Sequence, residues 1–266
     1  MLQHLAKPVL FLIAITLHFS SFAAYHGKDK NLTRTEKLSA PGIYQGYTTR
    51  QYNGYKYSSQ YIATRDSVLL AVDVFLPKQL EKGKKVPTIL YLTRYVRSIR
   101  AKFPFSLFKD PILAVVPEDE VKFFNAFGYA VVIVDVRGSG ASLGERNMEF
   151  SPEEIADGKD IVDWIIAQPW SDGKLGTTGI SYVGTTAEML LVNKHPAVKA
   201  CIPRSNIFDL YNYIMFPGGV RMGPFIDAWG KTTQSLDQNN FLIFGRRCYG
   251  KIEILYLIFF LDIKFS

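Results

Sequence analysis

The stretch G-K-L-G-T-T-G-I-S-Y-V-G, residues 173–184, decides the fold of this chain. Residues 176–180 have the small and β-branched side chains of a short buried strand, and the residues from Tyr182 onward are typical of a helix. Ser181 lies at the junction between the two. A serine on a sharp strand-to-helix turn forms a nucleophile elbow, in which its hydroxyl stands clear of the sheet. We therefore expect Ser181 to be the centre of a site.

The glycines around Ser181 depart by one residue from the usual elbow spacing, G-x-S-x-G. Gly179 is in its usual place, but the second glycine is Gly184, and Val183 stands where it would be. Such positions need small residues because a β-carbon there would meet the neighbouring strand or helix. A serine that only caps the N-terminus of a helix would give a similar local pattern. The rest of the chain has to decide between the two interpretations.

Composition and charge narrow the class of protein. The chain has 266 residues, of which 48% are hydrophobic, so it can form one sizeable domain or two small ones. The net charge of +7 is spread along the chain, and no nucleic-acid-binding module accompanies it, so no nucleic-acid partner is expected. The two cysteines, Cys201 and Cys248, imply no disulfide framework and are expected to be free. No cofactor and no metal site are predicted.

The first residues are predicted to be a targeting segment. An apolar run at 9–17 is followed by the small-residue triplet Ser21-Phe22-Ala23, which is typical of a secretory signal peptide over residues 1–23. The run is too short for a transmembrane helix, which needs about 20 residues. The protein is therefore expected to be exported, either periplasmic or secreted. Residues 24–56 are polar and basic and are predicted to be an extended lead-in.

Between residues 57 and 207 the pattern alternates between strands and helices, which predicts an α/β core. Two strand-like runs separated by Arg65-Asp66-Ser67 predict an antiparallel hairpin, and the later, continuously apolar runs predict parallel strands. Strands are expected at residues 57–64, 68–76, 87–93, 129–136, 176–180 and 199–203, and helices at 118–127, 157–168 and from 182 onward. Ligands bind beyond the carboxyl ends of such parallel strands, where Ser181, Tyr95 and the loop after Val136 fall.

The loop at residues 137–144, R-G-S-G-A-S-L-G, offers a competing interpretation as a dinucleotide fingerprint. Its third glycine comes one residue late, no helix opens directly after it, and the strand before it is not the first of the sheet. We therefore favour a structural loop whose glycines let the backbone turn closely beneath the edge of the sheet.

A basic cluster follows the strand predicted at 87–93. Arg94, Arg97, Arg100 and Lys102 are expected to face water, as charge runs usually do. The alternative is that they line a site for an acidic acyl group.

Five segments of the chain resemble, in order and spacing, one family of enzymes. They are residues 61–77 (Y-I-A-T-R-D-S-V-L-L-A-V-D-V-F-L-P), 86–95, 127–145, 157–170 and 176–184. The family is that of cocaine esterase, glutaryl-cephalosporin acylases, α-amino-acid ester hydrolases and X-Pro dipeptidyl-peptidases. Its elbow is G-x-S-Y-x-G, so the displaced Gly184 fits the resemblance, which covers about residues 60–230. It implies an α/β-hydrolase fold with a mostly parallel sheet, an antiparallel N-terminal hairpin and a helical cap.

The resemblance also implies a chemistry and its residues. Ser181 would be the nucleophile that is acylated by an ester or amide substrate, a small molecule or a short peptide. The backbone N–H of Tyr182 and the phenol of Tyr95 would donate to the oxyanion of the tetrahedral intermediate. Residues 208–238 would be the start of the helical cap. Without the resemblance, the aromatic residues of 208–230 would be interpreted as core, and Tyr95 as a strand end with its hydroxyl in water.

The residues after Ser181 depart from the family pattern. The triad of this fold needs an acid and then a histidine after the nucleophile. The only histidine there is His195, which fourteen helical residues would place roughly 20 Å along the elbow helix at ~1.5 Å per residue, at the wrong end. His4, His18 and His26 lie in the leader and lead-in. A lysine base is a further possibility, since burial lowers the pKa of lysine, but no lysine is singled out.

The tail at residues 239–266 changes abruptly to Ile, Leu, Phe and Tyr. Its apolar run at 252–261 is too short to span a bilayer. We expect out-of-frame translation past a frameshift or premature stop, so that the fold is incomplete at the C-terminus, has an unpaired sheet edge, and is weakly active or inactive. The alternative is a non-catalytic exported binding protein that uses the apolar tail to associate with a membrane or a partner.

Overall fold

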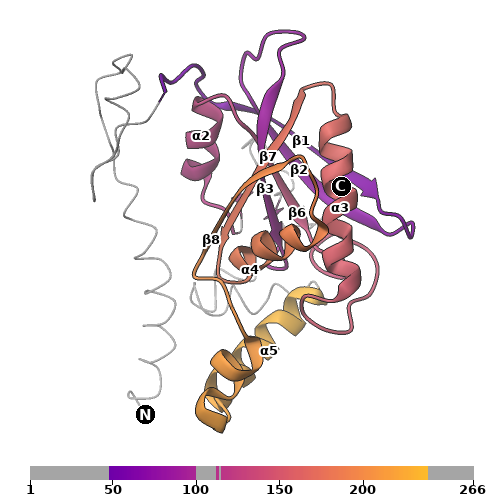
Figure 1. Cartoon of the computed structure of the whole chain (residues 1–266), viewed down its shortest axis with the longest axis vertical. Helices are drawn as coiled ribbons and strands as arrows, with labels where there is room; N and C mark the ends of the chain where they lie inside the picture. The colour runs from indigo at the N-terminus through magenta and orange to yellow at the C-terminus, as the bar shows by residue number, and fades with distance from the viewer. Residues whose placement is uncertain (1–47, 100–111, 114, 239–266) are drawn as a thin grey trace, which may run out of the picture. The chain divides into compact units, whose positions relative to one another are not determined.

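The structure is a computed structural model that describes residues 48–99, 112–113 and 115–238 (Figure 1). The predicted signal peptide (1–23), the lead-in up to residue 47 and the tail (239–266) lie outside the described residues. The helices and strands of the described residues belong to the compact unit that begins at Gln51.

A six-stranded mixed sheet forms the centre of this unit. Strands β1 and β2 are antiparallel to each other, and β2 is antiparallel to β6, whereas β6, β3, β7 and β8 are parallel. This confirms the antiparallel start and the parallel remainder predicted from the hydrophobic pattern. In spatial order the strands are β1 (Tyr55–Ala63), β2 (Leu69–Pro77), β6 (Ala130–Asp135), β3 (Val86–Thr93), β7 (Ser171–Ile180) and β8 (Val198–Arg204).

A second, two-stranded sheet pairs β4 (Ser98–Ile99) with β5 (Ile112–Leu113). The helices of the described residues are α2 (Glu118–Ala126), α3 (Pro152–Ala167), α4 (Tyr182–Met189) and α5 (Gly223–Asp237), with short helical turns at Leu190–Asn193, Leu210–Met215 and Pro217–Gly219.

The hydrophobic core lies on both faces of the large sheet, because successive side chains of a strand point to opposite faces. Val132 of β6 belongs to a cluster that includes Ile161 of α3. Its neighbour Val131 belongs to a second cluster, which includes Val121 of α2. Helices α3 and α2 therefore cover opposite faces of the sheet, and Figure 1 shows them on either side of it. Every residue of β6 is buried, as expected for a parallel strand covered on both sides.

Helix α3 begins five residues before its predicted start at Asp157. Ser151 is the N-cap, and its Oγ accepts a hydrogen bond of 3.2 Å from the backbone N–H of Glu154. Pro152 occupies the first turn, where its missing N–H is not needed. The prediction followed the apolar face of the helix and missed this capping signal. Strand β7 likewise starts at Ser171, before the predicted 176.

Arg94 and Arg97, the two described members of the basic cluster after β3, are neither solvated nor free to bind an acyl group. Arg97 is buried, and its Nε lies 2.9 Å from Asp73 Oδ1 while its Nη1 lies 2.7 Å from Asp135 Oδ2. Arg94 is also buried and pairs with two carboxylates, Glu149 and Asp237. Both predictions for these two arginines were wrong, because charges that look solvated in a local pattern find partners on distant elements. Arg100 and Lys102 lie outside the described residues.

The glycine-rich loop after β6 wraps the carboxylate that ends the strand. Asp135 Oδ2 accepts a hydrogen bond of 3.1 Å from the backbone N–H of Ala141. Gly140 has a φ of 56°, and a β-carbon at this position would lie 2.8 Å from Asp135 Oδ1. The backbone therefore turns tightly around Asp135, which supports the interpretation as a structural loop.

We predict that Ser151→Ala lowers the free energy of unfolding by about 1 kcal/mol, because the first turn of α3 loses the side-chain cap. Urea unfolding followed by circular dichroism measures the change. The matched control is Ser235→Ala, whose hydroxyl bonds only to Lys231 O on the exposed surface of α5. It should change stability by less than about 0.5 kcal/mol. Equal losses in both variants would contradict the assigned cap.

Candidate active site

Ser181 lies on a strained turn between β7 and α4. Its backbone has φ 59° and ψ −123°, which L-residues rarely adopt. Its hydroxyl caps no N–H of α4, so the interpretation as an ordinary helix cap is wrong. The turn is held by a hydrogen bond of 3.0 Å from the N–H of Ser181 to Arg204 O of β8. The side chain is exposed at the carboxyl edge of the parallel strands, as expected of an elbow.

The two glycines of the elbow are required because neither position has room for a β-carbon. A β-carbon at Gly184 would lie 2.5 Å from Arg204 O and 3.0 Å from Gly179 O. One at Gly179 would lie 2.6 Å from Val183 O. Val183 itself packs in the hydrophobic cluster on the α2 face of the sheet. The displaced glycine is therefore explained: the backbone of α4 approaches β8 at residue 184, whereas residue 183 faces the core.

Tyr182 is anchored beneath the turn through its side chain. The ring is buried and stacks on Phe150, with centroids 4.4 Å apart and an interplanar angle of 21°. Its hydroxyl donates a hydrogen bond of 2.6 Å to Glu154 Oε1. Tyr182, whose backbone N–H begins α4, is thus held in place by Phe150 and by Glu154 of α3.

Tyr95 follows β3, the strand next to β7, so the two strands bring Tyr95 and Ser181 to the same edge of the sheet. Its ring packs edge-on against Tyr182, with centroids 5.8 Å apart and an interplanar angle of 72°. Its Oη accepts a hydrogen bond of 3.1 Å from Trp229 Nε1. Burial raises the pKa of Tyr95, so at neutral pH the phenol keeps its proton and can donate it.

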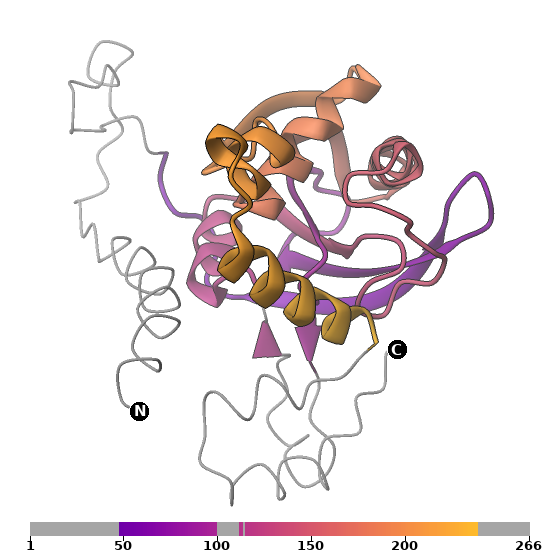
Figure 2. The ribbon, with the colours of Figure 1, turned by 90° about the horizontal axis from the view of Figure 1, so that it is seen from below.

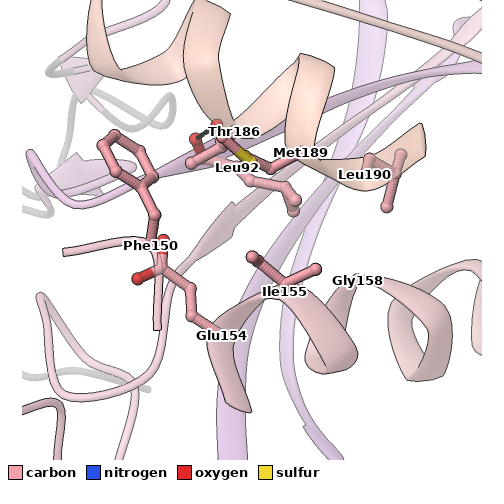
Figure 3. Close-up of a pocket in the computed structure, with 8 residues that line it drawn as sticks. All are labelled: Leu92, Phe150, Glu154, Ile155, Gly158, Thr186, Met189 and Leu190. Carbon is pink, nitrogen blue, oxygen red and sulfur yellow. Dashed lines mark hydrogen bonds between the residues drawn. The ribbon is translucent and has the colours of Figure 1, made fainter. Parts of the chain in front are cut away.

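Glu154 is a buried carboxyl that sequence analysis missed. Burial raises its pKa, although the hydrogen bond from Tyr182 and the charge of Arg146 act in the opposite direction. It borders a cavity of about 10 Å³, which is close to the space of one water molecule. Figure 3 shows this cavity between α3 and the elbow helix; its lining residues are Leu92, Phe150, Glu154, Ile155, Gly158, Thr186, Met189 and Leu190. The capping signal of α3 is the sequence feature that could have located Glu154.

Arg94 connects the elbow to α5. Only 1% of its side chain is exposed, and it forms an ion pair with Glu149 and another, of 2.7 Å, with Asp237. Its guanidinium also lies over two aromatic rings, 5.8 Å from the centroid of Tyr182 and 5.2 Å from that of Trp229. Helix α5 is therefore attached to the residues that surround Ser181.

The aromatic segment before α5 does not form core. Phe208 is 85% exposed, Tyr213 is 67% exposed and Tyr211 is 61% exposed. Interpreting this segment as core, from the sequence without the resemblance, was therefore wrong. The assignment of residues 208–238 to the start of a cap stays a prediction.

His195 is bound away from Ser181. Its Nε2 lies 3.1 Å from Asp163 Oδ1 on α3, and its Nδ1 accepts a hydrogen bond from the N–H of Ala197. It precedes β8 and so lies at the amino edge of the parallel strands, opposite the edge of Ser181. Within the described ranges it is the only histidine, and no group of three or more His, Cys, Asp or Glu side chains could hold a metal ion.

In the part of the chain that the structure covers, no helix is both long and apolar enough to cross a membrane.

The mixed sheet and the strained serine elbow at its carboxyl edge define an α/β-hydrolase. The fold is similar to that of a CocE/NonD family hydrolase from Staphylococcus aureus, with a TM-score of 0.58 and 24% identity over 72% of this chain and 38% of the other. Residues 66–241 match the family described as X-Pro dipeptidyl-peptidase (S15 family). The chain belongs to this family, which confirms the resemblance found in the sequence.

Two curated relatives give the similarity in more detail. A Mycobacterium bovis protein named "Putative serine esterase Mb1866c" is 45% identical over 204 residues, 76% of this chain and 32% of the relative. The cocaine esterase of a Rhodococcus species is 34% identical over 175 residues, 65% of this chain and 27% of the relative. This chain therefore spans about a third of the length of these relatives. The family consists of serine hydrolases, esterases and peptidases, and ester or peptide substrates are typical of it.

We predict that Glu154→Gln becomes more stable relative to the unchanged protein as pH rises. The folded pKa of Glu154 is raised. The stability linked to its protonation is therefore present below the unfolded pKa, about 4.3, and is lost as pH rises through the folded pKa. The glutamine cannot ionise and still offers an oxygen to Tyr182, so it does not undergo this loss. Urea unfolding of both proteins at a series of pH values measures the difference.

The adjacent Glu153 supplies a control of opposite sign. Its pKa is lowered by a hydrogen bond from its own backbone N–H and by one from the Ser151 side chain, so its stabilising effect is present above the unfolded pKa and is lost as pH falls. Glu153→Gln should therefore become less stable relative to the unchanged protein as pH rises. The same pH trend in both variants would contradict the assigned environment of Glu154.

Proposed function

We propose that this chain carries the acylation site of a serine hydrolase that cleaves ester or amide bonds. The observation that carries the proposal is the strained, exposed Ser181 at the carboxyl end of β7, followed by Tyr182, against whose ring Tyr95 packs. In this proposal Ser181 Oγ attacks the substrate carbonyl carbon and its proton passes to a base. The tetrahedral intermediate then collapses, expels the alcohol or amine, and leaves an acyl-enzyme that water hydrolyses.

The oxyanion of that intermediate would be stabilised by two donors, the backbone N–H of Tyr182 and the phenol of Tyr95. The N–H after an elbow serine faces the position of the oxyanion because the helix begins there. The phenol supports this role because it is protonated and lies on the neighbouring strand end. Loss of one such donor typically costs about a hundred- to a thousand-fold in rate.

We further propose that this chain alone is only weakly active, because the described residues place no histidine near Ser181 to act as base. Its one histidine in the described core is bound to Asp163 at the opposite edge of the sheet. In a well-characterised serine protease, loss of the catalytic histidine lowers turnover by about a million-fold.

Esters are the proposed first substrate class, since two relatives are named as esterases. Export of the protein, which the leader at residues 1–23 supports, also stays a proposal.

We predict that added imidazole acts as the general base in place of a histidine and so restores part of the Ser181-dependent rate. In imidazole buffers, the chain should hydrolyse p-nitrophenyl acetate faster than Ser181→Ala does, and the difference should rise with imidazole concentration. Imidazole cleaves such esters by itself, so subtracting the Ser181→Ala rate isolates the contribution of Ser181. Stopped samples analysed by mass spectrometry should show an acetylated Ser181 peptide.

The matched control is Ser205→Ala, which removes another exposed serine just after β8, at the same edge of the sheet. It should leave the imidazole-dependent rate unchanged. If Ser181→Ala is as fast as the unchanged protein at every imidazole concentration, the proposed function is wrong. A fast Ser181-dependent rate without imidazole would instead contradict the proposed weak activity, while the assignment of Ser181 as nucleophile would stand.

A further inference from the structure

We propose that Trp229 is a positioning residue for the oxyanion site: its indole N–H holds the oxygen of Tyr95 so that the phenolic proton points toward the substrate. The inference deepens the proposed function and rests on it. It follows from the only polar contact that the described residues show at Tyr95 Oη, the hydrogen bond of 3.1 Å from Trp229 Nε1.

The direction of this hydrogen bond is set by chemistry. An indole nitrogen carries a proton and cannot accept, so Tyr95 Oη must be the acceptor. A phenol has one proton and two lone pairs. The bond to Trp229 occupies a lone pair and leaves the proton available. Trp229 therefore prevents Tyr95 from donating in its direction and leaves donation to the open side, where a substrate oxygen would lie.

The ring of Tyr95 is held on two further sides. Its plane packs edge-on against Tyr182, and its backbone N–H donates a hydrogen bond of 2.9 Å to Thr93 Oγ1 at the end of β3. The position of the hydroxyl is thus determined by the strand below, by Tyr182 beside it and by Trp229 beyond it. A preorganised donor of this kind needs no rearrangement when charge develops on the substrate.

The hydrogen bond from Trp229 also strengthens the phenol as a donor. Burial raises the pKa of Tyr95, and the N–H of Trp229 opposes this rise, as do the positive charges of Arg94 and Arg146. A phenol that accepts a hydrogen bond donates a stronger one, because chains of hydrogen bonds polarise one another. The phenol remains protonated and becomes more acidic than burial alone would make it.

Helix α5 is attached so that Trp229 keeps this position. Asp237, eight residues further along the helix, pairs with Arg94 at 2.7 Å and with Arg146 at 3.3 Å. Two turns of helix separate the attachments at Trp229 and Asp237 by about 12 Å. Arg94 directly precedes Tyr95, so both attachments of α5 are made to the end of the same strand, β3. Figure 2 views the core from this side and shows α5 lying across it.

The first test observes the hydrogen bond itself. In ¹⁵N-labelled protein each of the three tryptophans gives one indole N–H signal, and the signal of Trp229 is assigned by its absence in Trp229→Phe. We expect this proton to exchange slowly with solvent. Tyr95→Phe should shift the signal and speed exchange at least tenfold, whereas Asp227→Asn, which alters an exposed ion pair on the same helix, should do neither. An unchanged signal in Tyr95→Phe would overturn the proposal.

The second test asks whether Trp229 acts through Tyr95. In the imidazole assay, Trp229→Phe should lower the Ser181-dependent kcat about tenfold and change KM less than twofold, a smaller loss than removal of an oxyanion donor. In a Tyr95→Phe background the same substitution should have almost no further effect, because residues that act as a unit are not additive. Additive losses, or a change confined to KM, would mean that Trp229 only supports the fold or contacts the substrate.

The two tests separate the inference from the function on which it rests. If no Ser181-dependent rate exists in the unchanged protein, the proposed function is wrong, and the indole signal alone decides whether Trp229 holds Tyr95. With a Ser181-dependent rate present and Trp229→Phe at full activity, the function stands and the inference is overturned.

Discussion

The site depends on one backbone constraint, the turn that forces Ser181 into a positive φ of 59° between β7 and α4. A non-glycine residue in such a conformation is costly and persists only where the surroundings over-determine it. Here the surroundings are the close approach of α4 to β8 at Gly184 and the hydrogen bond from Ser181 N–H to Arg204 O. The strained conformation leaves the hydroxyl exposed at the edge of the sheet. A helix-capping serine would instead turn its hydroxyl back toward the backbone.

A layer of buried polar side chains supports this turn. Glu154 anchors the ring of Tyr182, and Arg94 lies against the same ring while it pairs with Asp237 of α5. Leaving a buried charge such as that of Arg94 without a partner is strongly destabilising, yet an intact buried pair adds little stability over an apolar replacement. We therefore interpret this layer as a device that specifies geometry. It holds the two tyrosines beside Ser181 with fixed contacts and joins α5 to them.

The described residues hold their one histidine far from the serine elbow. The proposed nucleophile and oxyanion donors lie within the described residues, whereas the histidine that these residues contain is held at the opposite edge of the sheet by Asp163. The chain covers about a third of its curated relatives.

The sequence by itself determined the α/β alternation, the antiparallel start of the sheet, the elbow with its displaced glycine, and the family. These features are local: period-two apolar runs, glycines where backbones nearly touch, and motifs whose order survives in a single chain. Only the tertiary structure decided that Arg94 and Arg97 are buried, that Glu154 lies under Tyr182, and that Trp229 bonds to Tyr95. The last two residues are 134 positions apart, and a charged or aromatic side chain at such a separation carries no local sign of its partner. Its burial and bonding follow from the distances between packed elements, which the order of residues along the chain does not contain.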